Sequence, residues 1–246
     1  MNAIILAAGI GSRLNPLTAH IPKPLVRVEG IPIIERQITM LKEKGITDIS
    51  IITGHLHELF AYLVPKFGVR LIYNEHYASF NNLYSLFLAK EYFGDSYILE
   101  GDVYLSRNFL IAAPGTSTYF CGHKDKISQE WIVNYDTHVR NILIVSDEHL
   151  NDPLYKNGAK IFAGISFWTR QDAALIKSSM EMHVASSLAE KDAPQRNYFW
   201  DMMILENLPR LSIAVQSLDS NDWFEIDRYT ELQALSSHLD MAAVAR

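Results

Sequence analysis

Cysteine is almost absent from this sequence, and long apolar runs are missing altogether. Cys121 is the only cysteine among 246 residues, which excludes an intrachain disulfide framework and a cysteine metal cluster. No apolar run approaches the roughly 20 residues that a membrane-spanning helix needs. The N-terminus begins directly with an apolar segment and shows neither the basic region nor the cleavage site of a secretory signal. We therefore expect a cytoplasmic protein that does not enter a membrane.

An excess of positive charge is also missing, because the formal net charge is −6. An acidic chain has no general field that attracts nucleic acid or anionic membranes, so any affinity for phosphate must be local. Hydrophobic residues make up 48% and charged residues 20%, which are ordinary values for a globular protein. We see no repeat, low-complexity tract or linker, and we expect one domain over residues 1–246.

Short apolar strands alternate with helical periodicity in the first half of the sequence. This alternation is typical of right-handed crossovers and of a parallel, Rossmann-like sheet. In such sheets ligands collect at the carboxyl ends of the strands. The expected strands are residues 3–6, 49–53, 69–73 and 97–99, and the expected helices between them are residues 33–41, 57–67 and 83–88.

The periodicity changes after residue 102, where strands follow one another through polar turns. This pattern predicts antiparallel strands that extend the first sheet. The fold class we expect is therefore α/β, with a mixed, mainly parallel central sheet flanked by helices. The later strands are expected at residues 117–120, 131–135, 139–145, 161–168, 211–215 and 223–227, and the later helices at residues 171–185, 198–207 and 230–239.

The turn after the first expected strand carries the strongest chemical signal. Residues 6–14 read LAAGIGSRL, and small residues there allow a backbone to approach a ligand with its N–H groups aimed at phosphate oxygens. The turn lacks the Gly-Lys-Ser/Thr of a Walker A loop, and Leu14 stands where a dinucleotide fingerprint has its third glycine. Arg13 adds one cation, and Lys23 adds another between two prolines that restrict its direction. These residues predict a phosphate-binding loop.

Acidic residues follow two later strands. Asp102 comes after the buried strand at residues 97–99, where a carboxylate is costly unless a cation meets it. Mg²⁺ is usually held by one or two carboxylates together with substrate phosphates, so Asp102 is a candidate ligand. Glu225 and Asp227 are two residues apart and would share one face of a strand. A turn-forming Asp102 and a solvent-facing Glu225–Asp227 pair are the alternatives.

Residues 6–25 resemble the signature of the nucleotidyltransferases that join an NTP to a sugar phosphate or alcohol phosphate and release pyrophosphate. From Met1 to about Asp227 the chain is most similar to the bacterial cytidylyltransferases for phosphocholine. The resemblance implies a fold of the nucleotide-diphospho-sugar transferase type and a Mg²⁺ ion on Asp102 and Asp227. It also implies catalysis by Lys23 at the α-phosphate, Arg13 at the β- and γ-phosphates, and Asp102.

The same resemblance implies a set of nucleotide contacts in the first half of the chain. On the residues alone, Asn81 and Asn82 are more simply interpreted as a cap of the helix that follows, and both roles are compatible. The implied nucleotide-binding residues are Leu6, Ala7, Ala8, Gly9, Gly11, Ser12, Arg13, Lys23, Asn81, Asn82 and Ser85.

The acceptor is expected to meet the second half of the chain. A quaternary ammonium group is best held by aromatic faces with nearby carboxylates, and Trp131 and Trp200 adjoin acidic residues. The resemblance implies that Asp201 and Glu225 also face the acceptor. The expected substrates are CTP and a phosphorylated amino alcohol or phosphonate, with no nucleic acid.

Three alternatives remain open at this point. The acceptor could be 2-aminoethylphosphonate or a sugar 1-phosphate, or the protein could be a non-catalytic nucleotide-binding regulatory subunit. Lys23, Asp102 and Asp227 argue against the regulatory subunit, because a binding module needs no metal pair.

Overall fold

A computed structural model describes residues 1–125, 130–144, 157–190 and 192–244 of the protein. Among the described helices, none combines the length and the apolar character that crossing a bilayer requires. The expected strands of the first half all occur in these ranges, and most of the later strands pair antiparallel, as the polar turns predict.

The central sheet has nine strands in the order β10-β9-β11-β6-β1-β4-β5, with β8 joined to β11 and β12 joined to β8. Four strands of the first half run parallel, with Leu6 paired to Ile52 on one side and to Glu100 on the other. Both faces of β1 are covered, which explains its unbroken run of apolar residues. The parallel strands are β1 (Asn2–Ala7), β4 (Ile49–Thr53), β5 (Arg70–Tyr73) and β6 (Ser96–Glu100).

The second half extends this sheet with strands that pair antiparallel, except that β12 runs parallel to β8. The long strand β11 pairs antiparallel with β6 and with β8, and its register with β8 shifts between Phe162 and Ser166. Gly164 lies inside this shift with a φ of +70°, a conformation that glycine adopts without strain. The added strands are β8 (Thr118–Lys124), β9 (Trp131–Tyr135), β10 (Val139–Ile144), β11 (Ala159–Trp168) and β12 (Ala214–Ser217).

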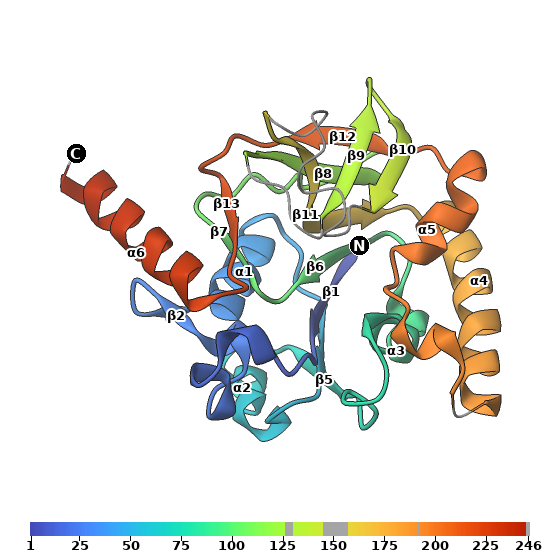
Figure 1. Ribbon diagram of the computed structural model, residues 1–246, viewed down its shortest axis with the longest axis horizontal. Helices are drawn as coiled ribbons and strands as arrows, with labels where there is room; N and C mark the ends of the chain where they lie inside the picture. The colour runs from blue at the N-terminus through green and yellow to red at the C-terminus, as the bar shows by residue number, and fades with distance from the viewer. Residues whose placement is uncertain (126–129, 145–156, 191, 245–246) are drawn as a thin grey trace.

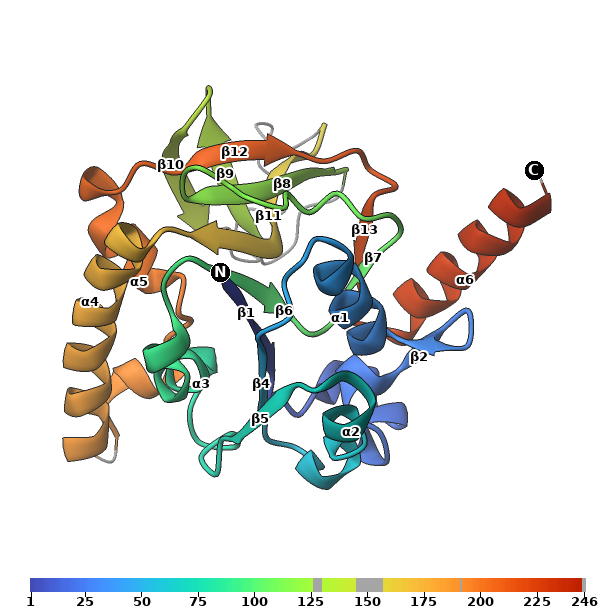
Figure 2. The ribbon, with the colours of Figure 1, turned by 180° about the vertical axis from the view of Figure 1, so that it is seen from behind.

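Helices cover both faces of the sheet, as Figures 1 and 2 show from opposite sides. On one face α1 (Ile33–Glu43) and α2 (Leu63–Phe67) close a core that includes Ile38 and Leu63. A second core, with Leu86 and Met180, lies under the helices of the other face. Those helices are α3 (Asn82–Leu88), α4 (Arg170–Ala189) and α5 (Met202–Asn207).

The helix α6 (Tyr229–Val244) projects from the body in both views (Figures 1 and 2). Leu235 anchors it in a third core beside Ile226 and Tyr104. Two small sheets lie nearby, one made of β2 (Arg27–Val28) and β3 (Ile31–Pro32), the other of β7 (Val103–Leu105) and β13 (Trp223–Glu225). Short 3₁₀ helices occur at Ser12–Leu14, Leu17–Ala19, Lys23–Leu25, His57–Phe60, Lys90–Tyr92, Pro194–Asn197 and Leu208–Arg210.

Some element boundaries differ from the expectation. The single helix expected over residues 57–67 is two pieces, because Pro65 has no N–H to continue a helix and is accommodated in the first turn of α2. The helix expected from residue 198 begins at Met202, because the Tyr198 carbonyl accepts from the Leu83 N–H and the Trp200 N–H donates to Asn82 Oδ1. The last strands also shift, to residues 214–217 and 223–225.

Candidate active site

The glycine-rich loop lies at the carboxyl end of β1, between the ends of its two parallel neighbours. Gly101 donates its backbone N–H to the carbonyl of Leu6, and His55 donates to the carbonyl of Ala8. Gly11 has a φ of +68°, and a Cβ atom there would stand 3.1 Å from Thr18 Cγ2. Leu6, Ala7 and Ala8 are buried, whereas Gly9, Ser12 and Arg13 are exposed. The exposed half of the loop is therefore the part that a phosphate could reach.

Gly9 has open space around it. Within the described part of the chain, no atom beyond its own chain neighbours lies within 4 Å of the point where a Cβ would stand. The backbone there is open to solvent, as close approach to a ligand requires.

Lys23 joins this loop to two distant carboxylates. It begins a 3₁₀ turn between Pro22 and Pro24, and only 8% of it is exposed. Its ammonium Nζ lies 2.5 Å from Asp102 Oδ2 and also donates to Asp227 Oδ1. Burial alone would lower the pKa of Lys23, but the charges and hydrogen bonds of the two carboxylates outweigh burial and raise that pKa above its ordinary value. Lys23 is therefore a fixed positive charge.

Arg13 approaches Asp227 from the solvent side. Its Nη1 lies 2.6 Å from Asp227 Oδ2, and 58% of its side chain is exposed. The structure thus brings together Arg13, Lys23, Asp102 and Asp227, which the sequence analysis expected at one site.

The pairing of β13 with β7 assembles the acidic side of the site. Glu225 is opposite Val103 in this register, and Ile226 N–H donates to the carbonyl of Asp102. The backbone N–H of Asp227 donates to Glu231 Oε2 at 2.7 Å, which fixes the turn into α6. As a result, one carboxylate oxygen from each of Asp102, Glu225 and Asp227 lies within 4.8 Å of the others.

This carboxylate cluster suits a divalent cation. Hard oxygen ligands are the ones that Mg²⁺ and similar ions prefer, and three carboxylates at this spacing can share one ion. The residues that would hold it are Asp102 and Asp227, with Glu225 beside them. Such an ion would neutralise charge on phosphate oxygens at the end of the glycine-rich loop.

Two further charged residues belong to the site but were not among the residues selected from the sequence. Glu100 lies two residues before the expected Asp102, and burial raises its pKa well above the ordinary value, with the charges of Asp102, Asp201 and Glu225 adding to the effect. Lys124 lies 2.6 Å from Glu130 Oε1 and 3.3 Å from Glu225 Oε2. Glu100 has a visible sequence signal, because it ends a buried strand; Lys124 has none.

Asp201 lies buried near Glu100. It is 5% exposed, and Tyr119 donates its hydroxyl to Asp201 Oδ1 at 3.4 Å. Burial raises the pKa of Asp201 from 3.8 to about 7. Glu225 behaves similarly, since burial raises its pKa to about 7 against the opposing charge of Lys124. Buried negative charge of this kind calls for a cationic partner.

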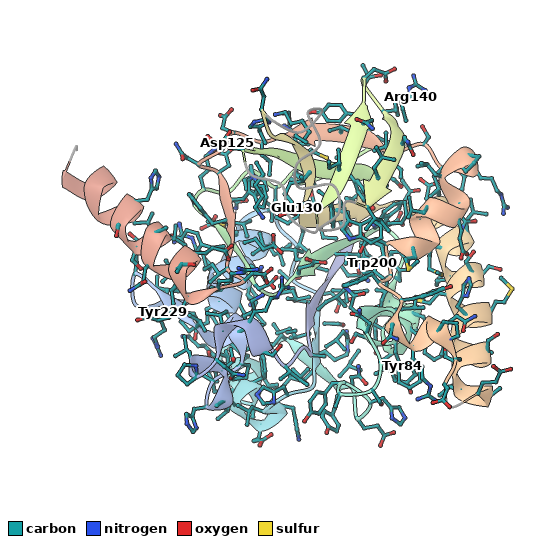
Figure 3. All side chains as sticks on the ribbon, viewed as in Figure 1. Tyr84, Asp125, Glu130, Arg140, Trp200 and Tyr229 are labelled. Carbon is teal, nitrogen blue, oxygen red and sulfur yellow. The ribbon has the colours of Figure 1, made fainter. Side chains whose placement is uncertain are left out.

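The two tryptophans expected to contact the acceptor lie in different surroundings. Trp200, labelled in Figure 3, is fully buried, and its ring stands at 87° to that of Trp168 with centroids 6.0 Å apart. A ring in that position presents no face to solvent, so its contribution is to the core. Trp131 is only partly buried, and its ring meets Phe199 edge-on at 6.2 Å. Of the two, Trp131 has the position that a contact with a ligand requires.

Asn81, Asn82 and Ser85 tie α3 to its neighbours. Asn81 caps the helix and donates to the carbonyl of Asn197, while Asn82 Oδ1 accepts from Trp200 N–H at 2.8 Å. Ser85 is buried and accepts a hydrogen bond from Asn74. The helix-cap interpretation of Asn81 thus describes its contacts in this structure, and Asn82 fixes the chain just before Asp201.

The elevated pKa of Asp201 predicts a pH-dependent stability. Between roughly pH 4 and pH 7 the folded protein keeps a proton that the unfolded chain has lost, so wild-type stability falls as pH rises through this window. Asp201→Asn removes this dependence. From pH 5 to pH 8, the free energy of unfolding of the wild type should therefore fall by on the order of 2 kcal/mol relative to that of the variant. Urea unfolding at both pH values measures this. The same difference in the free energy of unfolding between variant and wild type at pH 5 and at pH 8 would contradict the prediction.

Comparisons with known proteins identify the family of this chain. The family model described as nucleotidyl transferase matches residues 2–141. A choline-phosphate cytidylyltransferase of Streptococcus pneumoniae is 39% identical over 241 residues, covering 97% of this chain and 98% of that protein. A choline-phosphate cytidylyltransferase of Haemophilus influenzae is 39% identical over 92% of each chain. A 2-aminoethylphosphonate cytidylyltransferase of Lancefieldella rimae is 30% identical over 95% of this chain and 91% of that protein.

Solved structures support the same assignment. The CTP:phosphocholine cytidylyltransferase of Streptococcus pneumoniae superposes with a TM-score of 0.88 at 39% identity, covering 97% of this chain and 98% of that one. A glucose-1-phosphate thymidylyltransferase of Bacillus anthracis, 21% identical, has a TM-score of 0.73 over 97% of this chain and 94% of that chain and shares the fold. The mixed sheet flanked by helices thus confirms the expected fold class. The chain belongs to the nucleotidyl transferase family.

Proposed function

We propose that this protein transfers a cytidylyl group from CTP to phosphocholine, forming CDP-choline and pyrophosphate, in the cytoplasm. The observation that carries the proposal is 39% identity over 97% of the chain to a choline-phosphate cytidylyltransferase. The convergence of Lys23, Asp102 and Asp227 at the glycine-rich loop supports it, since these groups fit a triphosphate and a metal ion.

In this reaction an anionic oxygen of phosphocholine attacks the α-phosphorus of CTP. The new P–O bond forms as the bond to the bridging oxygen breaks, and pyrophosphate leaves with that electron pair. The attacking oxygen is already ionised, so no side chain has to remove a proton. Catalysis then consists of positioning and of stabilising charge on the phosphate oxygens.

Each part of the loop has a role in this proposal. The backbone around Gly9 and Ser12 faces the triphosphate, Lys23 acts at the α-phosphate and Arg13 at the β- and γ-phosphates. Asp102 and Asp227 would hold Mg²⁺, which would further neutralise phosphate charge.

The acceptor's cationic group is proposed to meet Asp201 and Glu225, with Trp131 contributing an aromatic face. A carboxylate that is shielded from solvent gains from a permanent positive charge that needs no hydrogen-bond acceptor. A second candidate acceptor is 2-aminoethylphosphonate. It is favoured by the Lancefieldella relative and by carboxylates that can accept N–H hydrogen bonds from a primary amine.

The acceptor is tested by measuring kcat/KM with CTP, Mg²⁺ and each of phosphocholine, phosphoethanolamine and 2-aminoethylphosphonate. We expect the wild type to prefer phosphocholine. Trp131→Ala should weaken use of phosphocholine by about 1–2 kcal/mol, because an aromatic face is lost. Asp201→Asn should instead harm the primary amines most, through a lost charge-assisted hydrogen bond.

Tyr229→Ala provides the matched control, since Tyr229 is an exposed aromatic residue on α6 (Figure 3). This variant should leave all three values unchanged. A several-fold preference of the wild type for either primary amine would overturn phosphocholine as the acceptor and leave cytidylyl transfer in place.

A further inference from the structure

Both carboxylate oxygens of Asp227 are engaged by cations of the chain itself. Oδ1 accepts from Lys23 Nζ, and Oδ2 lies 2.6 Å from Arg13 Nη1. Lys23 Nζ also lies 2.5 Å from Asp102 Oδ2. The ammonium group therefore bridges the two carboxylates that would hold a divalent cation.

In the proposed reaction these four groups have to bind the substrate and the metal ion instead of one another. The triphosphate requires the cations Lys23 and Arg13, and the divalent cation requires the oxygens of Asp102 and Asp227. In the structure these groups satisfy one another, so either ligand arriving alone has to compete with an existing ion pair. When both arrive, each removes the partner that competes with the other.

We propose that Lys23 and Arg13 are internal counter-cations of the Asp102–Asp227 pair, and that their exchange onto the triphosphate couples nucleotide binding to divalent-cation binding. This inference rests on the proposed function, because it takes the triphosphate and the divalent cation as ligands of the site.

The burial of these groups makes the coupling between the two ligands strong. Side-chain exposure is 10% for Lys23, 21% for Asp102 and 14% for Asp227, so solvent screens the pairs weakly. Two such carboxylates without a cation between them repel, and a lysine without a counter-charge is costly to bury. Coupling between two ligands is reciprocal, so the same factor must appear in the affinity of each ligand measured with and without the other.

The test is binding of Mn²⁺, followed by electron paramagnetic resonance, with and without CTP. The wild type should bind Mn²⁺ weakly alone and at least tenfold more tightly with CTP. Lys23→Met should bind Mn²⁺ alone at least tenfold more tightly than the wild type, and CTP should add less. Arg140→Met, which removes the same charge from an exposed surface pair with Asp136, should behave like the wild type.

A second variant tests the exchange from the other side. Asp227→Asn should bind CTP in the presence of EDTA more tightly than the wild type does, because it leaves Lys23 and Arg13 less firmly held. Arg13→Met should show a smaller version of the Lys23→Met effect, and because 58% of the Arg13 side chain is exposed its removal is compatible with folding.

Equal Mn²⁺ affinity in the wild type and in folded Lys23→Met, checked by thermal unfolding, would overturn the inference. If Lys23→Met does not fold, two other results together would overturn the inference. Arg13→Met would have to bind Mn²⁺ as the wild type does, and Asp227→Asn would have to bind CTP as the wild type does. Failure of the proposed function gives a different result, since wild-type protein would then form no CDP-choline from CTP and phosphocholine whatever its Mn²⁺ affinity.

Discussion

Asp102→Asn and Asp227→Asn should each abolish metal-dependent turnover while leaving the fold intact. A neutral amide is a poor ligand for a hard cation, and both substitutions keep the shape of the side chain. The loss should appear as pyrophosphate release below detection with CTP, Mg²⁺ and phosphocholine. Far-ultraviolet circular dichroism and thermal unfolding show whether the fold survives.

The double variant distinguishes one metal site shared by Asp102 and Asp227 from two separate sites. If both residues serve one ion, the double variant should be little worse than either single variant, because one substitution already removes the ion's function. Asp48→Asn is the control, since Asp48 is an exposed carboxylate paired with Arg70. It lies at the amino end of β4, whereas the site lies at the carboxyl ends of the parallel strands. Losses that add in the double variant would show that the two residues act separately.

Lys23→Ala should lower kcat by roughly two to three orders of magnitude, because the ammonium acts mainly on charge that develops at the α-phosphate. Nucleotide binding should survive in part, through the loop backbone and Arg13. Steady-state kinetics with varied CTP separates kcat from KM.

Lys90→Ala is the matched control for this substitution. Lys90 forms a surface pair with Glu181, and its loss should leave turnover unchanged. Near wild-type turnover in Lys23→Ala would show that Lys23 does not take part in catalysis.

The parallel half of the fold could be predicted because its strands are buried on both faces. Such strands carry unbroken apolar runs, and the ends of these runs mark where polar ligand-binding residues follow. Asp102 was found for that reason. The pairing of Lys23 with Asp227 has no periodic signature, because it depends on β13 reaching β7 across the fold.

The environment of the tryptophans could not be predicted from their neighbours in the sequence. Trp200 stands beside an acidic residue in the chain, yet its ring turns into the core against Trp168 while Asp201 points toward Tyr119. Composition near a residue does not specify which way its side chain turns. The same limit applies to Lys124, whose partner Glu225 is 101 residues away.

The pairing of β13 with β7 also sets when the site can form during protein synthesis. Asp227 follows Lys23 by 204 residues, and sequence-distant contacts form late because the intervening chain must first be closed into a loop. Once β1 to β7 have been synthesised, the chain contains Lys23 and Asp102 but not yet Glu225 or Asp227. The nascent chain can therefore build its parallel sheet while it still lacks two of the three carboxylates of the cluster, and catalytic competence arrives only with the docking of residues 223–227.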